Sequence, residues 1–179
     1  MNKQLVFGLI GKSGAGKTTA ADYLHRNYGV GNLMFAAPLK EAASIFFGDV
    51  FEEGNRNTPI EGTNTIKRKL ICDLADLVKN VDNDVILKIA EKNLRRMSSI
   101  SAVQFTDVRF PSEVKWLKGK RAVFIEIIRD DAEEIPFKHE SEEADFSQLQ
   151  KITIYNNGTI KELHKALDKA MLHYLEYLD

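Results

Sequence analysis

The sequence predicts one α/β domain in which helices cover both faces of a parallel sheet. Short apolar segments alternate along the chain with segments of helical period, and this alternation is typical of parallel strands joined by helical crossovers. The length of 179 residues is about that of one domain. No repeat, low-complexity segment or linker divides the chain, so we expect residues 1–179 to form a single domain with a parallel five-stranded sheet.

The first half of the chain contains two predicted strands, each followed by a helix. Leu5–Ile10 is almost wholly apolar, as expected for a strand buried on both faces. A helix is predicted over Lys17–Tyr28, a weak strand over 32–35 and a second helix over about 38–48. The segment 49–64 is polar and rich in turn-forming residues, which predicts a loop.

Two amphipathic helices are expected next, because apolar residues recur at helical spacing. The first carries Ile66, Leu70, Leu74, Leu77 and Val81. The second starts after the capping residue Asn83 and carries Ile86, Ile89, Ala90 and Met97.

The second half of the chain continues the alternation. Strands are predicted over 102–108 and 121–128, with a short helix over about 111–118 between them. A charged segment without a clear period, 129–147, precedes the last strand, 151–155. A turn then leads to a final helix with one apolar face, formed by Ile160, Leu163, Leu167, Met171, Tyr174 and Leu178.

Composition narrows the classes of function. The formal net charge is −1, from 25 Lys and Arg against 26 Asp and Glu, which disfavours non-specific nucleic-acid binding. A single cysteine, Cys72, excludes an intrachain disulfide and a multi-cysteine zinc site. No apolar run approaches the roughly 20 residues of a membrane helix. We therefore expect a cytoplasmic protein without nucleic-acid or membrane partners.

A complete phosphate-binding motif follows the first strand. The segment reads Gly11-Lys12-Ser13-Gly14-Ala15-Gly16-Lys17-Thr18 and matches G-x-x-x-x-G-K-[ST]. Glycines allow several backbone N–H groups to converge on one anion, and the following helix adds the positive end of its dipole. Lys17 is expected to reach the β- and γ-phosphates, and the Thr18 hydroxyl to bind magnesium. The expected cofactors are therefore ATP and Mg²⁺, bound by Gly11, Ser13, Gly14, Ala15, Gly16, Lys17, Thr18 and Thr19.

A second candidate region ends the strand predicted over 102–108. Ligands of open α/β sheets gather at the carboxyl ends of the strands, so Asp107 is placed to face the phosphates. It would hold magnesium or act on the attacking oxygen, or it is an ordinary turn residue. Arg109 is correspondingly either a phosphate clamp or a surface arginine.

Four segments of the chain, together with the phosphate loop, resemble phage-type deoxynucleoside monophosphate kinases. Residues 107–114 resemble the D-V-R-F-P-N-E segment of that family. The other matches, in the family's order, are Phe35-Ala36-Ala37-Pro38-Leu39-Lys40 to F-A-x-P-L-K, His139-Glu140-Ser141-Glu142 to H-x-S-E, and Ile154-Tyr155-Asn156-Asn157-Gly158-Thr159 to I-x-N-N-G-T. With the phosphate loop the matches span residues 5–165.

The resemblance implies a P-loop kinase fold with a helical acceptor region over about 38–100 and a lid over about 129–147. It also implies transfer of the γ-phosphoryl group of ATP to a (deoxy)nucleoside monophosphate, by a monomer or homodimer in the cytoplasm, the host's if the protein is phage-encoded. Implied catalytic residues are Lys17, Asp107, Arg109 and Arg129. Implied substrate-binding residues are Lys40, Arg68, Arg109 and His139, with Thr18 and Asp107 at the metal and Asn157 and Gly158 at the adenine.

The chain departs from the family around Arg68. Cys72 stands where the family has Gln, and Ala75-Asp76 replaces Gly-Thr, which leaves the acceptor base open. One of Phe46, Phe47 or Phe51 is expected to stack on that base. Two alternatives stay open: another small-molecule kinase, such as one resembling dephospho-coenzyme A kinase, and a nucleotide-binding module without a phosphoryl acceptor.

Overall fold

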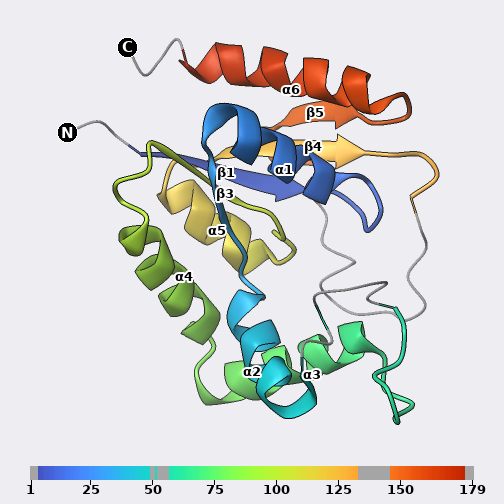
Figure 1. Ribbon diagram of the computed structural model, residues 1–179. Coiled ribbons are helices and arrows are strands. Elements are labelled where there is room, and N and C mark those ends of the chain that lie inside the picture. Colours follow the sequence, from blue (N-terminus) through green and yellow to red (C-terminus); the bar gives the residue numbers. More distant parts are fainter. Residues whose placement is uncertain (1–3, 49–50, 52–56, 133–145, 176–179) are drawn as a thin grey trace.

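Five parallel strands form one sheet in the order β2-β3-β1-β4-β5 (Figure 1). The computed structural model describes residues 4–48, 51, 57–132 and 146–175. The strands are β1 (Leu5–Ile10), β2 (Gly31–Leu33), β3 (Ala102–Phe105), β4 (Val123–Ile128) and β5 (Ile152–Tyr155). The apolar β1 lies at the centre of the sheet between β3 and β4, as a strand buried on both faces should.

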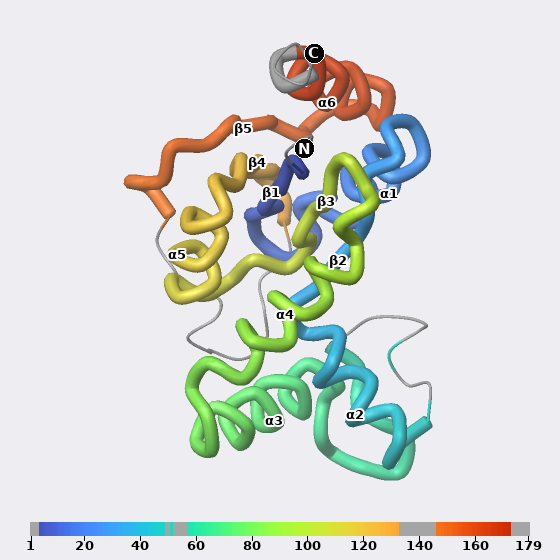
Figure 2. Tube along the Cα trace, turned by 90° about the vertical axis from the view of Figure 1, so that its left-hand side faces the viewer, coloured from blue at the N-terminus to red at the C-terminus, as the bar shows by residue number. Residues whose placement is uncertain are grey.

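Helices cover both faces of this sheet and also form a separate layer. On one face, α1 (Lys17–Tyr28) and α6 (Ile160–Leu175) bury their apolar residues against Phe7 and Leu9 of β1. On the other, α4 (Val85–Arg96) and α5 (Pro111–Gly119) pack in a second core with Phe105. The remaining helices, α2 (Ala37–Phe47) and α3 (Lys67–Val81), lie together on the side of the sheet opposite α6 (Figures 1 and 2).

Four of the five predicted strands have different bounds in the structure, and the contacts or backbone conformation of single residues explain two of these differences. β2 spans Gly31–Leu33 rather than 32–35, because the Phe35 N–H donates to the Asp107 side chain instead of to a neighbouring strand. β4 begins at Val123 rather than at 121, because Arg121 has a left-handed backbone with φ 57° that a strand cannot continue. β3 ends at Phe105 rather than at 108, so Asp107 lies just beyond the strand and not in it. β5 begins at Ile152 rather than at 151.

The inward face of α3 also differs from the predicted apolar stripe. The apolar pattern predicts that Leu77 and Val81 face inward, but their exposed fractions are 61% and 87%. Arg68 and Ala75 are the buried residues of this helix. The helix is therefore rotated so that a charged residue, Arg68, faces the interior of the molecule.

No helix in the described part of the chain combines the length and the apolar composition that crossing a bilayer requires.

Candidate nucleotide-binding site

The phosphate-binding motif forms the turn between β1 and α1. Gly11, Gly14 and Gly16 all have positive φ, at 138°, 77° and 102°. A Cβ at Gly11 would overlap the Ile127 carbonyl oxygen, and one at Gly16 would overlap the side-chain amide of Asn156. Only glycine meets both requirements, since other residues rarely adopt this backbone conformation. The motif glycines are therefore demanded by the fold itself.

The side chain of Lys17 folds back over the loop. Its Nζ donates to the carbonyl oxygens of Gly11 at 2.5 Å and Lys12 at 2.7 Å. The ammonium group therefore lies beside the backbone of the phosphate-binding motif.

A pocket beside this loop, which we call the phosphate pocket, gathers most of the predicted site residues. Its loop and α1 residues include Ser13, Gly14, Gly16, Lys17, Thr18 and Thr19. Its other walls include Lys40 of α2, Arg68 of α3, and Asp107 and Arg109 of the β3–α5 connection. Residues from four separate segments therefore meet at the carboxyl edge of the sheet, where ligands of such folds bind.

A second pocket, which we call the apolar pocket, adjoins the first between α2, α3 and the β3–α5 connection. Its wall residues are Phe35, Ala36, Leu39, Lys40, Phe51, Lys67, Arg68, Ile71, Cys72, Ala75, Ile86, Asp107, Arg109, Phe110 and Glu113. Of the three candidate stacking residues, Phe51 lies in this wall, whereas Phe46 and Phe47 are exposed on α2. The two pockets share Lys40, Arg68, Asp107 and Arg109.

Arg68 joins the helical layer to the phosphate loop. Its guanidinium Nη2 donates to Ser13 Oγ at 2.9 Å, and the residue is only 7% exposed. A solvated surface position is thereby excluded for Arg68, so α3 is in direct contact with the loop.

Asp107 is bonded through both carboxylate oxygens. Oδ1 accepts the Phe35 N–H at 2.8 Å, and Oδ2 accepts the Ala36 N–H at 2.9 Å. These bonds tie the end of β3 to the start of α2. Asp107 is therefore more than a local turn residue, and it also lines both pockets.

Glu113, which is not among the predicted site residues, fixes the backbone beside Arg109. Its Oε2 accepts the N–H groups of Arg109 at 2.7 Å and Phe110 at 3.0 Å, and the residue is 5% exposed. Burial, helped by the negative charge of Asp107, raises the pKa of Glu113 to about 7. A signal was present in the sequence, because Pro111 and Glu113 are typical of the first turn of a helix.

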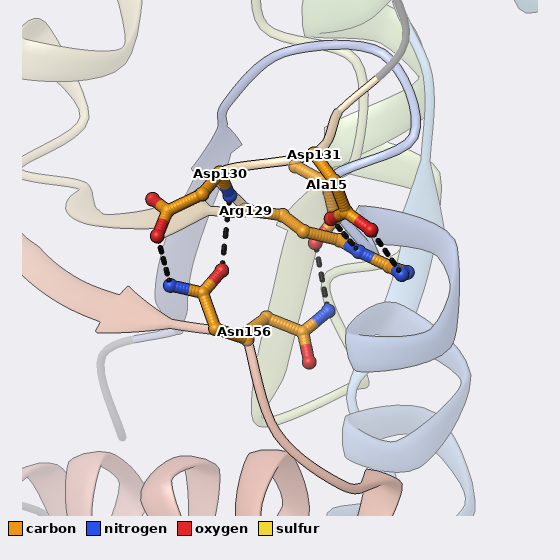
Figure 3. Close-up of polar contacts among 6 residues, drawn as sticks. Ala15, Arg129, Asp130, Asp131 and Asn156 are labelled. Atoms are coloured by element: carbon orange, nitrogen blue, oxygen red, sulfur yellow. Dashed lines mark hydrogen bonds and ion pairs between the residues drawn. The ribbon is translucent and has the colours of Figure 1, made fainter.

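The turn between β5 and α6 contacts the other side of the loop (Figure 3). The Asn156 side chain donates to the Ala15 carbonyl at 2.9 Å, while Asn157 exchanges hydrogen bonds with Asp130. The Arg129 guanidinium donates two hydrogen bonds to the Asp131 carboxylate, from Nε to Oδ1 at 2.6 Å and from Nη2 to Oδ2 at 3.1 Å. The lid prediction falls largely on residues 133–145, and His139 with them lies outside the described residues.

The side chains of the phosphate pocket are compatible with a magnesium ion that is coordinated mainly by the phosphates of a nucleotide. No group of three or more His, Cys, Asp or Glu side chains that would hold a metal occurs in the described ranges. In phosphate-loop proteins Mg²⁺ takes one or two protein oxygens and completes its coordination with phosphate oxygens and water. Thr18 and Asp107, both in the phosphate pocket, are suitable donors.

A parallel sheet of this order, whose central strand runs into a complete phosphate loop, defines the chain as a protein of P-loop kinase fold. No protein-family model matches the chain. A protein of Acanthamoeba polyphaga mimivirus, provisionally named a deoxynucleotide monophosphate kinase, is 28% identical over 188 residues, which cover 91% of this chain and 94% of the relative.

Solved structures agree with the fold. TT1252 from Thermus thermophilus superposes with a TM-score of 0.54 at 16% identity, covering 95% of this chain and 97% of that one. A protein of Chloroflexus aurantiacus, provisionally titled a kinase, gives a TM-score of 0.50 at 11% identity, covering 97% and 98%. At these identities the likeness concerns the fold.

Proposed function

We propose that this protein is a phosphotransferase that moves the γ-phosphoryl group of ATP to a (deoxy)nucleoside monophosphate. The observation that carries the proposal is the pair of adjoining pockets with Lys40, Arg68, Asp107 and Arg109 in both walls. A reaction between two phosphates requires such an arrangement, with donor and acceptor on opposite sides of the same charged groups.

Each pocket has the chemistry that one substrate requires. The phosphate loop, Lys17 and Thr18 supply amide groups, an ammonium and a hydroxyl for the ATP phosphates and their Mg²⁺. The apolar pocket offers Phe51 and Phe35 beside a charged mouth, which suits an aromatic base that carries a phosphate. The name of the mimivirus relative supports the same acceptor class.

In the proposed reaction an oxygen of the acceptor phosphate forms a bond to the γ-phosphorus, and the bond from that phosphorus to the β-bridging oxygen breaks. The products are ADP and a nucleoside diphosphate. Magnesium, when bound, neutralises charge on the β- and γ-phosphates. Lys17 and Arg109 stabilise the negative charge on the transferring group, and Arg68 orients the acceptor phosphate.

The test is ADP release from ATP and Mg²⁺ in the presence of a panel of acceptors. The panel contains the common deoxynucleoside and ribonucleoside monophosphates, with dephospho-coenzyme A, shikimate and gluconate as other kinase acceptors. Stimulation by one or more monophosphates is expected. Stimulation by another acceptor alone would reassign the enzyme, and stimulation by none would favour a nucleotide-binding module.

Lys17→Ala is the matched variant for this assay. The Lys17 side chain is not part of the apolar core, so the fold should survive its removal. The kcat should fall by on the order of 10²-fold or more, because the ammonium no longer neutralises charge on the phosphates. Near-normal turnover in a folded Lys17→Ala protein would refute the assignment of this loop to ATP.

A further inference from the structure

Asn156 connects the β5–α6 turn to the phosphate loop. Its side-chain Nδ2 donates to the Ala15 carbonyl oxygen at 2.9 Å, across 141 residues of sequence. Its backbone N–H donates to the Ile128 carbonyl at 2.7 Å, which fixes Asn156 to the end of β4. The amide therefore reaches the loop from a backbone that the sheet itself holds (Figure 3).

The same amide fills the space beside Gly16. A Cβ at position 16 would overlap Asn156 Nδ2, and Gly16 has a φ of 102°. The Ala15 residue on the other side of this peptide bond is 1% exposed. The Ala15–Gly16 peptide is thus held on one side by burial and on the other by a hydrogen bond.

Fixing this carbonyl also fixes an N–H group. In a planar trans peptide the C=O and the following N–H point in opposite directions. Because the Ala15 C=O points at Asn156, the Gly16 N–H must point away from it. In a loop of this motif the backbone N–H groups form the cradle for nucleotide phosphates.

We propose that Asn156 is a positioning residue for phosphate binding, which holds the Ala15–Gly16 peptide so that the Gly16 N–H remains directed at the nucleotide. The inference rests on the proposed function, since it requires that the loop bind ATP and ADP. The neighbouring Asn157 does not share this role, because its side chain binds Asp130 instead.

Two substitutions separate the hydrogen bond from packing. Asn156→Ala removes the amide, whereas Asn156→Asp keeps its shape but presents a carboxylate, which cannot donate to the Ala15 carbonyl at neutral pH. The matched control is Asn27→Ala. The Asn27 amide also donates to a backbone carbonyl at 2.9 Å, that of Tyr23, but on the exposed side of α1.

The measurement is the Kd of ADP by titration calorimetry, together with KM for ATP and for the monophosphate that the acceptor panel identifies. We expect both Asn156 variants to bind ADP about 10-fold more weakly, because part of a charge-assisted phosphate contact is lost. The KM for ATP should rise in parallel, and the KM for the monophosphate should not change. Asn27→Ala should match the parent in all three quantities.

Three results would overturn the proposal. ADP affinity within about twofold of the parent in both folded Asn156 variants would refute it outright. Normal affinity in Asn156→Asp with weak binding in Asn156→Ala would assign the effect to packing. Equal losses for ADP and the monophosphate would indicate a general structural defect. If the parent itself fails to bind ADP, the proposed function falls as well, so the two failures are distinguishable.

Discussion

The free energy of unfolding of the parent is expected to fall as the pH rises, because the buried Glu113 side chain then ionises. Glu113→Gln should remove this dependence on pH. Glu113 is 5% exposed, and its pKa is raised from 4.5 to about 7. Burial is the largest cause, followed by the negative charge of Asp107. The N–H bonds from Arg109 and Phe110, and the charge of Lys79, lower this pKa but do not compensate.

The sign follows from the protons bound in each state. Between about pH 4.5 and pH 7 the folded protein keeps a proton on Glu113 that the unfolded chain has released. The free energy of unfolding therefore falls as the pH rises through this window. The stabilisation is fully present below about pH 4.5 and is lost above about pH 7. The difference between the two pKa values, 4.5 and about 7, corresponds to a change of about 3 kcal/mol in the free energy of unfolding.

Urea denaturation of parent and Glu113→Gln, without nucleotide and with a chelator, measures this effect. The glutamine oxygen can still accept the two backbone N–H groups, but the side chain cannot ionise. The free energy of unfolding of the variant should rise by about 2.5 kcal/mol relative to that of the parent between about pH 5 and pH 8, because the rest of the change falls below pH 5.

Glu162→Gln is the control for this titration. Glu162 also accepts a backbone N–H at the start of a helix, that of Thr159, but it is exposed and its pKa is lowered. The difference in free energy of unfolding between Glu162→Gln and the parent should not change with pH over the same range. A flat difference for Glu113→Gln as well would refute the raised pKa.

Three further predictions concern residues shared by the two pockets. Asp107→Asn should lower the free energy of unfolding by about 2 kcal/mol, because the amide has one accepting oxygen and one of the two backbone N–H groups is left without an acceptor. If Asp107 also holds magnesium, kcat should fall while metal-free ADP affinity does not, and calorimetry with and without Mg²⁺ separates the effects. Arg109→Lys should lower kcat/KM for the monophosphate by at least ~10-fold, since an ammonium cannot replace a bidentate guanidinium. Arg68→Lys should chiefly raise the monophosphate KM, and steady-state kinetics that match the parent for both variants would place the acceptor elsewhere.

The elements that the sequence predicts best are those set by local pattern. β1 and α1 match the predicted bounds residue for residue. An unbroken apolar run bounded by glycines specifies the strand, and the phosphate motif specifies where the helix begins. By contrast, β2 ends early because of a side chain more than 70 residues away, as the Phe35–Asp107 bond shows. No local pattern contains that information.

The inward face of α3 illustrates the same limit. Its apolar residues alone suggest that Leu77 and Val81 are buried, but neither is. Arg68 faces inward instead, where Ser13 of the phosphate loop accepts its hydrogen bond. A helix with apolar residues on more than one side is oriented by its neighbours, so its buried face is a tertiary property.

The candidate site also has a part that the sequence predicts and a part that depends on tertiary contacts. Phosphate-loop residues are consecutive, and their spacing identifies them directly. The roles of Asn156 and Glu113 depend on which backbone groups they meet. For Asn156 that partner, Ala15, is 141 residues away. The resemblance to a family drew attention to both segments but did not indicate these contacts.

The charged groups between the two pockets impose a requirement on any acceptor. Lys40, Arg68 and Arg109 contribute three positive charges and Asp107 one negative charge to walls that both pockets share. Because both Asp107 oxygens already accept backbone N–H groups, its charge is partly satisfied by the protein. The junction therefore favours an anion on the acceptor side as well as on the loop side. In the proposed reaction this excess of positive charge favours an acceptor oxygen that belongs to a phosphate over one that belongs to a neutral alcohol.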